Sequence, residues 1–472
     1  MHGALLATPE NAMPGPGTAP AVPARRRNRS PHALALALFV AYTAVSVLRH
    51  RRMETLSWDL GIFEQAIRAY SRLQAPIADL KGPGTHILGD HFSPVTALLA
   101  PAYRLFPSPV TLLVAQSALF ALSAVPVARA AGRLLGRACG LAVAVAYGLS
   151  WGIQRAVDFD FHEICFAVPL IAFSLEALLR GRWRAALMCA VPLVLVKEDL
   201  GLTAAAIGLV VAWRARRAAP RSALCGLGLA AFGTAATLLT LTVVIPAFNT
   251  TGGYDYWAKI DGGLSPFAGA DVKLRTLAWL LLPTGLIALR SPLLLVALPT
   301  VGWRFLSADD HYWSTDWHYS AVLMPVLALA LADAVRTADR SRRPWLRAYA
   351  HRLPACAAGA ALALTTALPL SALADPAAYR KSAAVTAVED LLARIPDGAT
   401  VEANVGPISR LTGRCRVLWV GNARGTTPDF IALDNRSGWA GDPLAYARRL
   451  HPEARYRQAG AASGYVVLER RA

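Results

Sequence analysis

Long apolar runs separated by short polar connections fill the chain from residue 32 to residue 375. An α-helix needs roughly 20 apolar residues to span the hydrocarbon core of a bilayer, and on that criterion we predict about eleven membrane-spanning helices. The expected spans cover residues 32–48, 108–130, 138–153, 164–180, 185–197, 199–213, 223–246, 274–290, 291–305, 320–336 and 353–374.

Some apolar runs depart from a simple span. The neighbouring runs 185–197 and 199–213 are short, and we expect a broken or re-entrant pair whose irregular backbone lines a protein cavity. Segment 93–106 contains prolines and is expected to lie at the interface or to re-enter the membrane. The first run resembles the core of a signal peptide, but it lacks a small-residue cleavage site and Arg49 follows it at once, which indicates an uncleaved anchor.

The hydrophobic pattern divides the chain into three parts. Residues 1–31 form a predicted disordered cytoplasmic tail, and 32–375 a transmembrane domain with its first external loop at 49–107. From residue 376 to 472, helical and strand-like patterns alternate, which predicts a small extracytoplasmic α/β domain with a supporting or partner-docking role. We expect helices at 383–394 and 443–450 and strands at 400–405, 416–420, 429–433 and 465–468.

Composition and charge support an integral plasma-membrane protein. Of 472 residues, 55% are hydrophobic and 17% charged, with a mean hydropathy of +0.39, which excludes an ordinary soluble protein. The net charge of +18 would suggest nucleic acid in a soluble protein, but here the arginines cluster in short loops, as cytoplasmic loops require. This bias predicts a cytoplasmic N-terminus, an extracytoplasmic C-terminus and no nucleic-acid partner. Five of the six cysteines lie in apolar segments, so the sequence offers no disulfide framework.

Five polar clusters interrupt the apolar runs, and the predicted topology sends all of them to the exterior. They occupy residues 58–61, 89–94, 158–163, 197–199 and 311–319. Ionisable groups at the edge of a bilayer are costly to place and usually functional. We therefore expect the clusters to build one extracytoplasmic site.

Asp59 is the leading candidate for chemistry in the first external loop. It lies just beyond the first span, where a carboxylate above the bilayer can act as a general base toward an acceptor hydroxyl. The structural alternative is that Asp59 or Ser57 caps the N-terminus of the following helix.

Lys197, Glu198 and Asp199 place three charges in a nearly continuous apolar stretch, where an unpaired ion costs about 2.5–3.5 kcal/mol. We expect them to pair with Arg155 or His162 across the cavity, and a plain surface turn is the alternative.

The order of these motifs resembles a family of prokaryotic multispan membrane proteins catalogued as a domain of unknown function. The resemblance runs from residue 40 to 435 and rests on Asp-Leu-Gly-Ile-Phe-Glu-Gln at 59–65, Gly-Asp-His-Phe-Ser-Pro at 89–94, Asp-Phe-His at 160–162, Lys-Glu-Asp at 197–199 and an aromatic-His-Tyr at 317–319. The layout of that family is similar to the GT-C class of membrane glycosyltransferases. Members of that class take sugar from a polyprenyl-phosphate donor and keep a catalytic Asp or Glu in the first external loop.

By this resemblance the chain is an all-α polytopic membrane protein of GT-C-like layout with a small C-terminal α/β domain, and Asp59 is its catalytic base. The implied partners are membrane lipid, a polyprenyl-phosphate-linked sugar, and an extracytoplasmic glycan, lipid or protein acceptor. Many GT-C enzymes carry paired acidic residues, whereas the nearest acidic neighbours of Asp59 are Glu54 and Glu64. An inverting transfer also needs positive charge near the departing phosphate, and the candidates are Arg49, Arg51, Arg52, Arg155 and Lys197.

The other polar residues of the clusters are expected to form a network around the cavity. These are Glu64, Gln65, Asp90, His91, Asp158, His162, Glu198, Asp199, His318 and Tyr319. No cofactor is required by the sequence, but mixed oxygen and nitrogen ligands would suit a divalent manganese or zinc ion. The candidate ligands are Asp90, His91, Asp160, His162, His311 and Asp316, and the alternative is that they hydrogen-bond to one another and orient the loops.

A multispan transporter or flippase of a lipid-linked or anionic substrate is the alternative function. Transport predicts charges along an intramembrane path and repeat symmetry between the halves of the chain. The sequence has no convincing internal repeat, and its charges fall in loops, which favours transfer chemistry. A non-catalytic scaffold that presents the C-terminal domain fits poorly with so many acidic and histidine residues on one face.

Overall fold

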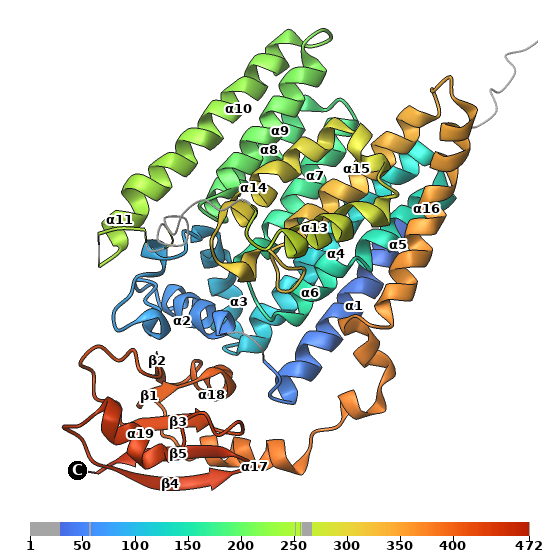
Figure 1. The fold of residues 1–472 in the computed structure, drawn as a ribbon. Helices are drawn as coiled ribbons and strands as arrows, with labels where there is room; N and C mark the ends of the chain where they lie inside the picture. Colours follow the sequence, from blue (N-terminus) through green and yellow to red (C-terminus); the bar gives the residue numbers. More distant parts are fainter. Residues whose placement is uncertain (1–28, 56–57, 251, 255, 257–266, 472) are drawn as a thin grey trace, which may run out of the picture.

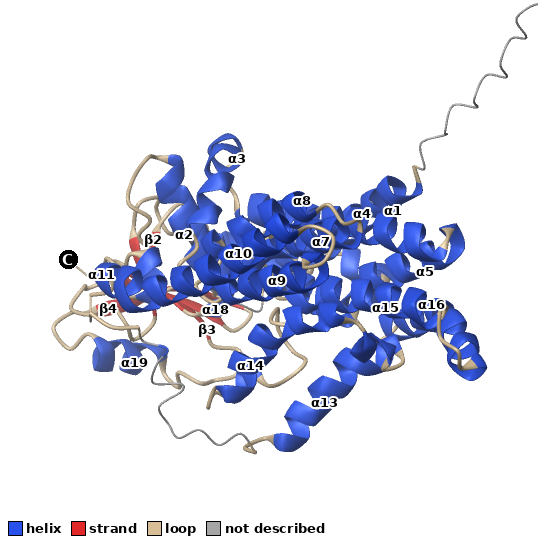
Figure 2. Cartoon of the chain, turned by 90° about the horizontal axis from the view of Figure 1, so that it is seen from above, coloured by secondary structure: helices blue, strands red, loops and turns tan. Residues whose placement is uncertain are grey.

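A helical bundle and a small mixed sheet make up the protein, as Figures 1 and 2 show. The computed structural model describes residues 29–55, 58–250, 252–254, 256 and 267–471. The predicted tail at 1–31 lies almost wholly outside these residues. The fold is mostly helical with a small C-terminal sheet domain, which confirms these two parts of the predicted fold class.

The bundle is built around one central helix. Of the apolar segment Ala321–Ala338, which contains α15 (Met324–Ala338), 89% is buried, against 28% for α1 at the periphery. The other helices of the bundle are α1 (Ser30–Arg51), α4 (Pro109–Leu135), α5 (Arg137–Gly148), α6 (Trp151–Asp158), α7 (Ala167–Leu179), α8 (Trp183–Ala190), α9 (Leu200–Ala215), α10 (Pro220–Leu239), α11 (Ile245–Phe248), α13 (Ala270–Leu281), α14 (Leu298–Leu306) and α16 (Pro344–Thr365).

Four helices in the described part of the chain are long and apolar enough to cross a membrane. They are Ser30–Arg51, Pro109–Leu135, Pro220–Phe248 and Ala321–Ala338, and the shorter apolar helices are Trp183–Leu195, Leu200–Ala215 and Pro292–Leu306. The larger number of spans stays a prediction. The expected span 138–153 is interrupted, because α5 ends at Gly148 and α6 begins only at Trp151.

The predicted broken pair is a short helix followed by a longer one. After α8 the chain continues as a 3₁₀ turn, Val191–Leu195, before α9 begins at Leu200. Helix α9 packs closely on α10, as the space around Gly201 shows: a Cβ atom there would lie 2.4 Å from the Gly233 carbonyl oxygen. Small residues of this kind let membrane helices approach each other. A π-helical segment, Thr240–Val244, joins α10 to α11, whose Pro246 cannot donate a backbone hydrogen bond.

The first external loop connects the two parts of the molecule through α2 (Asp59–Ser71). Leu60 and Phe63 on one side of α2 belong to the bundle core, whereas Ile62 and Ala66 on another side belong to a core shared with the C-terminal domain. Figure 1 shows α2 between the bundle and the sheet. Segment 93–106 forms a 3₁₀ helix, Pro94–Leu99, and the short α3 (Ala100–Leu105).

The C-terminal domain holds one five-stranded sheet with the order β2-β1-β3-β5-β4. Strands β1, β2 and β3 are parallel, with Thr400 opposite Arg416, and β5 pairs antiparallel with β3 and β4. The elements are α17 (Ala383–Leu392), β1 (Thr400–Ala403), α18 (Val405–Leu411), β2 (Arg416–Trp419), β3 (Phe430–Asp434), α19 (Pro443–Leu450), β4 (Tyr456–Ala462) and β5 (Tyr465–Arg470).

The sequence does not predict β4 and α18. Strand β4 is mostly exposed at the edge of the sheet, so its residues lack the apolar alternation that identifies a half-buried strand. Helix α18 has seven residues, including Gly406 and Pro407, which are poor helix formers. Tertiary packing overrides these local preferences, since Ile408 and Leu411 enter the shared core.

Candidate functional site

A cavity of about 780 Å³ lies where the bundle, the first external loop and the C-terminal domain meet. Each of the five polar clusters contributes to its lining. The lining residues from the clusters are Trp58, Asp59, Asp90, His91, Phe159, His162, Lys197, Glu198, Asp199, His311, Tyr312, Trp317, His318 and Tyr319. Segments that are far apart in the sequence therefore line the same cavity.

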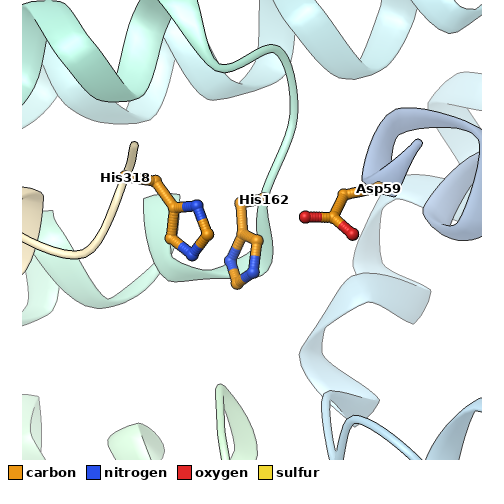
Figure 3. Close-up of side chains that lie close together, drawn as sticks. All are labelled: Asp59, His162 and His318. Carbon is orange, nitrogen blue, oxygen red and sulfur yellow. The ribbon is translucent and has the colours of Figure 1, made fainter. Parts of the chain in front are cut away.

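Asp59, His162 and His318 bring three potential ligand atoms together in this cavity. One side-chain oxygen of Asp59 and one ring nitrogen of each histidine all lie within 4.8 Å of one another. The two imidazole rings stack with centroids 3.6 Å apart. Figure 3 shows the Asp59 carboxylate pointing toward His162, with His318 on the far side of that ring.

Asp59 is not the cap of its helix. It is the first residue of α2, the cap position is Trp58, and no side chain of the described residues caps this end. Ser57, the other candidate cap, lies outside the described residues. The Asp59 carboxylate makes no hydrogen bond or ion pair within the described part of the chain, so a substrate can approach it.

Strained backbone places the two histidines. Asp160, two residues before His162, has φ +71°, and Trp317, directly before His318, has φ +67°. Such left-handed conformations are costly for residues other than glycine and are found where the surrounding structure enforces them. Burial, together with the neighbouring His162, lowers the pKa of His318 well below its usual value, so its imidazole is neutral at physiological pH.

A buried carboxylate, Glu163 at the end of the 158–163 cluster, lies beside His162. His162 Nδ1 lies 2.7 Å from Glu163 Oε2, and the Lys197 ammonium donates to Glu163 Oε1 at 2.9 Å. Although burial raises it, His162 and Lys197 hold the pKa of Glu163 well below its usual range. The predicted partnership of the 197–199 cluster with His162 thus runs through Glu163, and Arg155 takes no part in it.

A second charged group surrounds Asp90 in the same cavity. Lys81 Nζ lies 3.1 Å from Asp90 Oδ1, and His91 Nδ1 lies 2.5 Å from Asp90 Oδ2. Against the effect of burial, His91 and Lys81 lower the pKa of Asp90 far below its usual value. The Lys81 ammonium also lies 5.1 Å from the centre of the Trp58 ring. Asp90 is therefore an ionised partner of Lys81 and His91.

The predicted arginines for phosphate binding lie outside the cavity lining. Arg49 forms an ion pair with Asp158 at 2.9 Å, and Arg52 pairs with Glu54 at 2.6 Å. Arg51 is exposed at the end of α1. Carboxylates of the same chain thus neutralise Arg49 and Arg52. In contrast to the prediction, neither these arginines nor Asp158 line the cavity.

Arg155 and two of the predicted metal ligands are also placed elsewhere. Arg155 faces Asp316 at 3.8 Å, and neither residue lines the cavity. The Asp160 side chain does not line it either; its backbone carbonyl accepts a hydrogen bond from Gln116. His311 lines the cavity but groups with the partly buried Asp309 and the exposed Asp310 as a separate set of close ligand atoms.

Glu64 and Gln65 face the C-terminal domain and not the cavity. Glu64 accepts hydrogen bonds from Tyr103 and Thr412, and Gln65 Nε2 donates to the Val417 carbonyl at 2.8 Å. A helix advances about 100° per residue, so Glu64, five positions after Asp59, points about 140° away from it around α2. The predicted place of both residues in the cavity network is therefore wrong.

Several lining residues carry no sequence pattern that would predict them. They come from connecting segments, from helix α14 and from the C-terminal domain: Lys81, His86, Asn249, Tyr254, Tyr256, Trp303, Asn422 and Arg424. Lys81 directly precedes a Gly-Pro-Gly turn, which was a usable indication of a special conformation. The remainder depend on long-range packing.

A family model described as "Predicted membrane protein (DUF2079)" matches residues 49–467. The chain belongs to this family. The match confirms the predicted resemblance and extends it through most of the C-terminal domain of this DUF2079 protein. No curated protein matches the chain.

Two solved structures show what this DUF2079 fold is similar to. ArnT from Cupriavidus metallidurans bound to undecaprenyl phosphate has a TM-score of 0.55 and 14% identity, over 93% of this chain and 98% of that one. The apo state of the same ArnT has a TM-score of 0.49 and 13% identity, over 93% and 97% of the two chains. ArnT is a GT-C glycosyltransferase, so the predicted similarity of layout is confirmed at the level of the fold.

Proposed function

We propose that this protein is a membrane-embedded glycosyltransferase that moves a sugar from a polyprenyl-phosphate donor to an extracytoplasmic acceptor. The observation that carries the proposal is the convergence of all five polar clusters on one cavity with the Asp59 carboxylate in its wall. The lining also includes apolar side chains of the bundle helices, Leu202, Leu241 and Phe248, as a lipid-linked donor would need. A similar fold binds undecaprenyl phosphate in ArnT.

In this mechanism Asp59 is the general base. Its carboxylate accepts the proton of the acceptor hydroxyl while the hydroxyl oxygen bonds to the anomeric carbon of the sugar. The bond between that carbon and the donor phosphate oxygen breaks, and polyprenyl phosphate leaves with the electron pair. Cationic side chains in the cavity wall, including Lys81 and Lys197, offset the negative charge of that leaving group.

The residues around Asp59 also fit a divalent metal ion. A carboxylate and two imidazoles are a common ligand set for zinc and manganese, and neutral imidazole is the form that binds metal. His318 is neutral, and its Nδ1 atom is buried without a hydrogen-bond partner among the described residues. Asp59, His162 and His318 would hold the ion, which would supply positive charge to the donor phosphate when bound.

The orientation we propose keeps the N-terminus in the cytoplasm and the C-terminus outside the cell. It follows from the arginine-rich connections, such as 214–221 and 336–352, which the positive-inside rule assigns to the cytoplasm. A reporter enzyme that is active only in the cytoplasm, fused at the C-terminus, is expected to be inactive. An active reporter would contradict this topology.

The direct test is sugar transfer by membranes that contain the protein. Labelled polyprenyl-phosphate sugars are supplied to wild type, to Asp59→Asn and to the control Asp316→Asn, whose carboxylate is more than half exposed and outside the cavity. Loss of a general base is expected to lower the rate by about 10²–10⁴-fold in Asp59→Asn, with the control close to wild type.

Equal transfer by wild type and Asp59→Asn would remove Asp59 as the base. Absence of transfer by wild type from any donor would contradict the glycosyltransferase and favour transport of a lipid-linked or anionic substrate.

A further inference from the structure

The C-terminal domain reaches the cavity through the connection between β2 and β3. Asn422 and Arg424 of this connection line the cavity together with residues of the bundle and of the first external loop. We propose that Arg424 is an anion-binding residue of the site that contacts the phosphate group of a lipid-linked ligand. The identity of that anion rests on the proposed function, whereas the binding role of Arg424 rests on the geometry below.

Arg424 differs from the other cations of the cavity wall in its partners. Lys81 is paired with Asp90 at 3.1 Å, and Lys197 with Glu163 at 2.9 Å. Arg424 makes no ion pair with any residue of the described chain, and its one hydrogen bond there joins Nε to Asn422 Oδ1 at 3.2 Å. Its two terminal nitrogens are thus available to an external anion.

The backbone that carries Arg424 is strained and is tied to the first external loop. Arg424 has φ +42°, a conformation that costs free energy for a residue with a side chain. Asn422 Nδ2 donates to the Lys81 carbonyl at 3.2 Å, which ties the connection to the first external loop. Such strain persists only where surrounding contacts enforce it, and it is typical of ligand-binding positions.

Gly82 provides the space that the guanidinium occupies. Its φ of +132° favours glycine, and a Cβ atom there would lie 3.0 Å from Arg424 Cζ and 3.1 Å from Nε. Any side chain at this position would push the Arg424 guanidinium aside. The Lys81-Gly82 segment and Arg424 therefore fit together across the interface between the loop and the domain.

The domain that carries Arg424 is fixed to the first external loop. Arg416 forms two parallel hydrogen bonds with the Asp79 carboxylate, each 3.0 Å long. The Trp58 and Trp419 rings lie 5.1 Å apart, and a shared hydrophobic core lies behind them. Because the domain that carries Arg424 is anchored before a ligand arrives, binding does not have to order the domain. An arginine in such a place suits bidentate recognition of phosphate.

Binding of undecaprenyl phosphate to the purified full-length protein in detergent tests this assignment. Quenching of tryptophan fluorescence is a suitable measurement, since Trp58, Trp303 and Trp317 line the cavity. We expect Arg424→Ala to weaken binding by about 10- to 100-fold, as loss of a charge-assisted hydrogen bond does. The matched control is Arg457→Ala on the edge strand β4, whose ion pair with Glu469 is far from the cavity lining.

A second variant guards against a folding defect in the first. Gly82→Ala leaves the chemistry of Arg424 intact but displaces its guanidinium, so it should weaken binding in the same direction. Arg424→Lys should recover part of the affinity, because it restores the charge without the planar two-point geometry. Wild-type affinity in Arg424→Ala would overturn the proposal, as would absence of binding by wild type.

The results also separate this inference from the proposed function. If undecaprenyl phosphate binds through Arg424 but the protein transfers no sugar from any donor, the glycosyltransferase fails and the anion site stands. If Asp59→Asn abolishes transfer while Arg424→Ala binds the lipid normally, the glycosyltransferase stands and the anion site fails.

Discussion

Replacing Glu64 with glutamine perturbs a buried carboxyl group at the interface between α2 and the C-terminal domain. The Tyr103 hydroxyl donates to Glu64 Oε1 at 2.8 Å, and the Thr412 hydroxyl donates to Oε2. Burial raises the pKa of Glu64 to about 7, although Thr412, Tyr103 and Arg68 each act to lower it. The charge state of this group therefore changes near neutral pH.

The size of the effect on folding stability follows from the pKa shift of Glu64. A change from the ordinary value of 4.5 to about 7 is about 2.5 pH units, which corresponds to roughly 3 kcal/mol at 1.36 kcal/mol per unit. The folded protein holds this proton more tightly than the unfolded chain. Its contribution to stability is thus full below pH 4.5 and is lost as the pH rises through about 7.

Glutamine stays neutral at every pH, so Glu64→Gln should abolish this slope. Above pH 7 the variant should gain up to about 3 kcal/mol, less about 1 kcal/mol because an amide NH₂ replaces one accepting oxygen. Thermal unfolding of the detergent-solubilised protein, followed by circular dichroism between pH 5 and 8.5, measures the difference from wild type.

Asp390→Asn is the matched control for the pH series. Asp390 is an exposed carboxylate on α17, so the same chemical change there should leave the pH dependence of wild type intact. The reasoning about Glu64 would be refuted if Glu64→Gln kept the wild-type slope, or if it unfolded at a lower temperature than wild type at pH 8.

Further predictions concern the packing of α2 and the metal ligands. Gly61→Ala should destabilise the protein by about 1–3 kcal/mol and reduce transfer, because its Cβ would lie 2.3 Å from Ile408 Cγ2. Gly359→Ala in α16 is the control, because a Cβ there meets nothing within 4 Å, and it should be neutral or stabilise the protein by up to about 1 kcal/mol. Thermal unfolding compares the two variants, and equal destabilisation by both would contradict the close contact between Gly61 and Ile408. Elemental analysis of the purified protein should find zinc or manganese that is lost in His318→Ala and kept in His311→Ala. The reverse pattern would assign the ion to the group at 309–311.

Some elements could be predicted because their information is local. The predicted helices at 383–394 and 443–450 agree with α17 and α19. In α19 the start is also defined locally, because the Asp442 side chain accepts hydrogen bonds from the backbone of Leu444 and Ala445. Strand β4 could not be predicted, since its edge position removes the apolar alternation. The polar clusters were equally visible in the sequence, because ionisable residues stand out in an apolar chain.

The sequence by itself determined that the chain is a mostly helical membrane protein, where its polar clusters fall, and that Asp59 opens a helix after the first span. Only the tertiary structure decided which members of each cluster share a cavity. Asp59 faces His162, whereas Glu64 of the same helix faces Thr412. The physical reason is that helical rotation and long-range packing together fix where a side chain points. Lys81, Glu163 and Arg424 become partners of the site through segments that meet only in the folded protein.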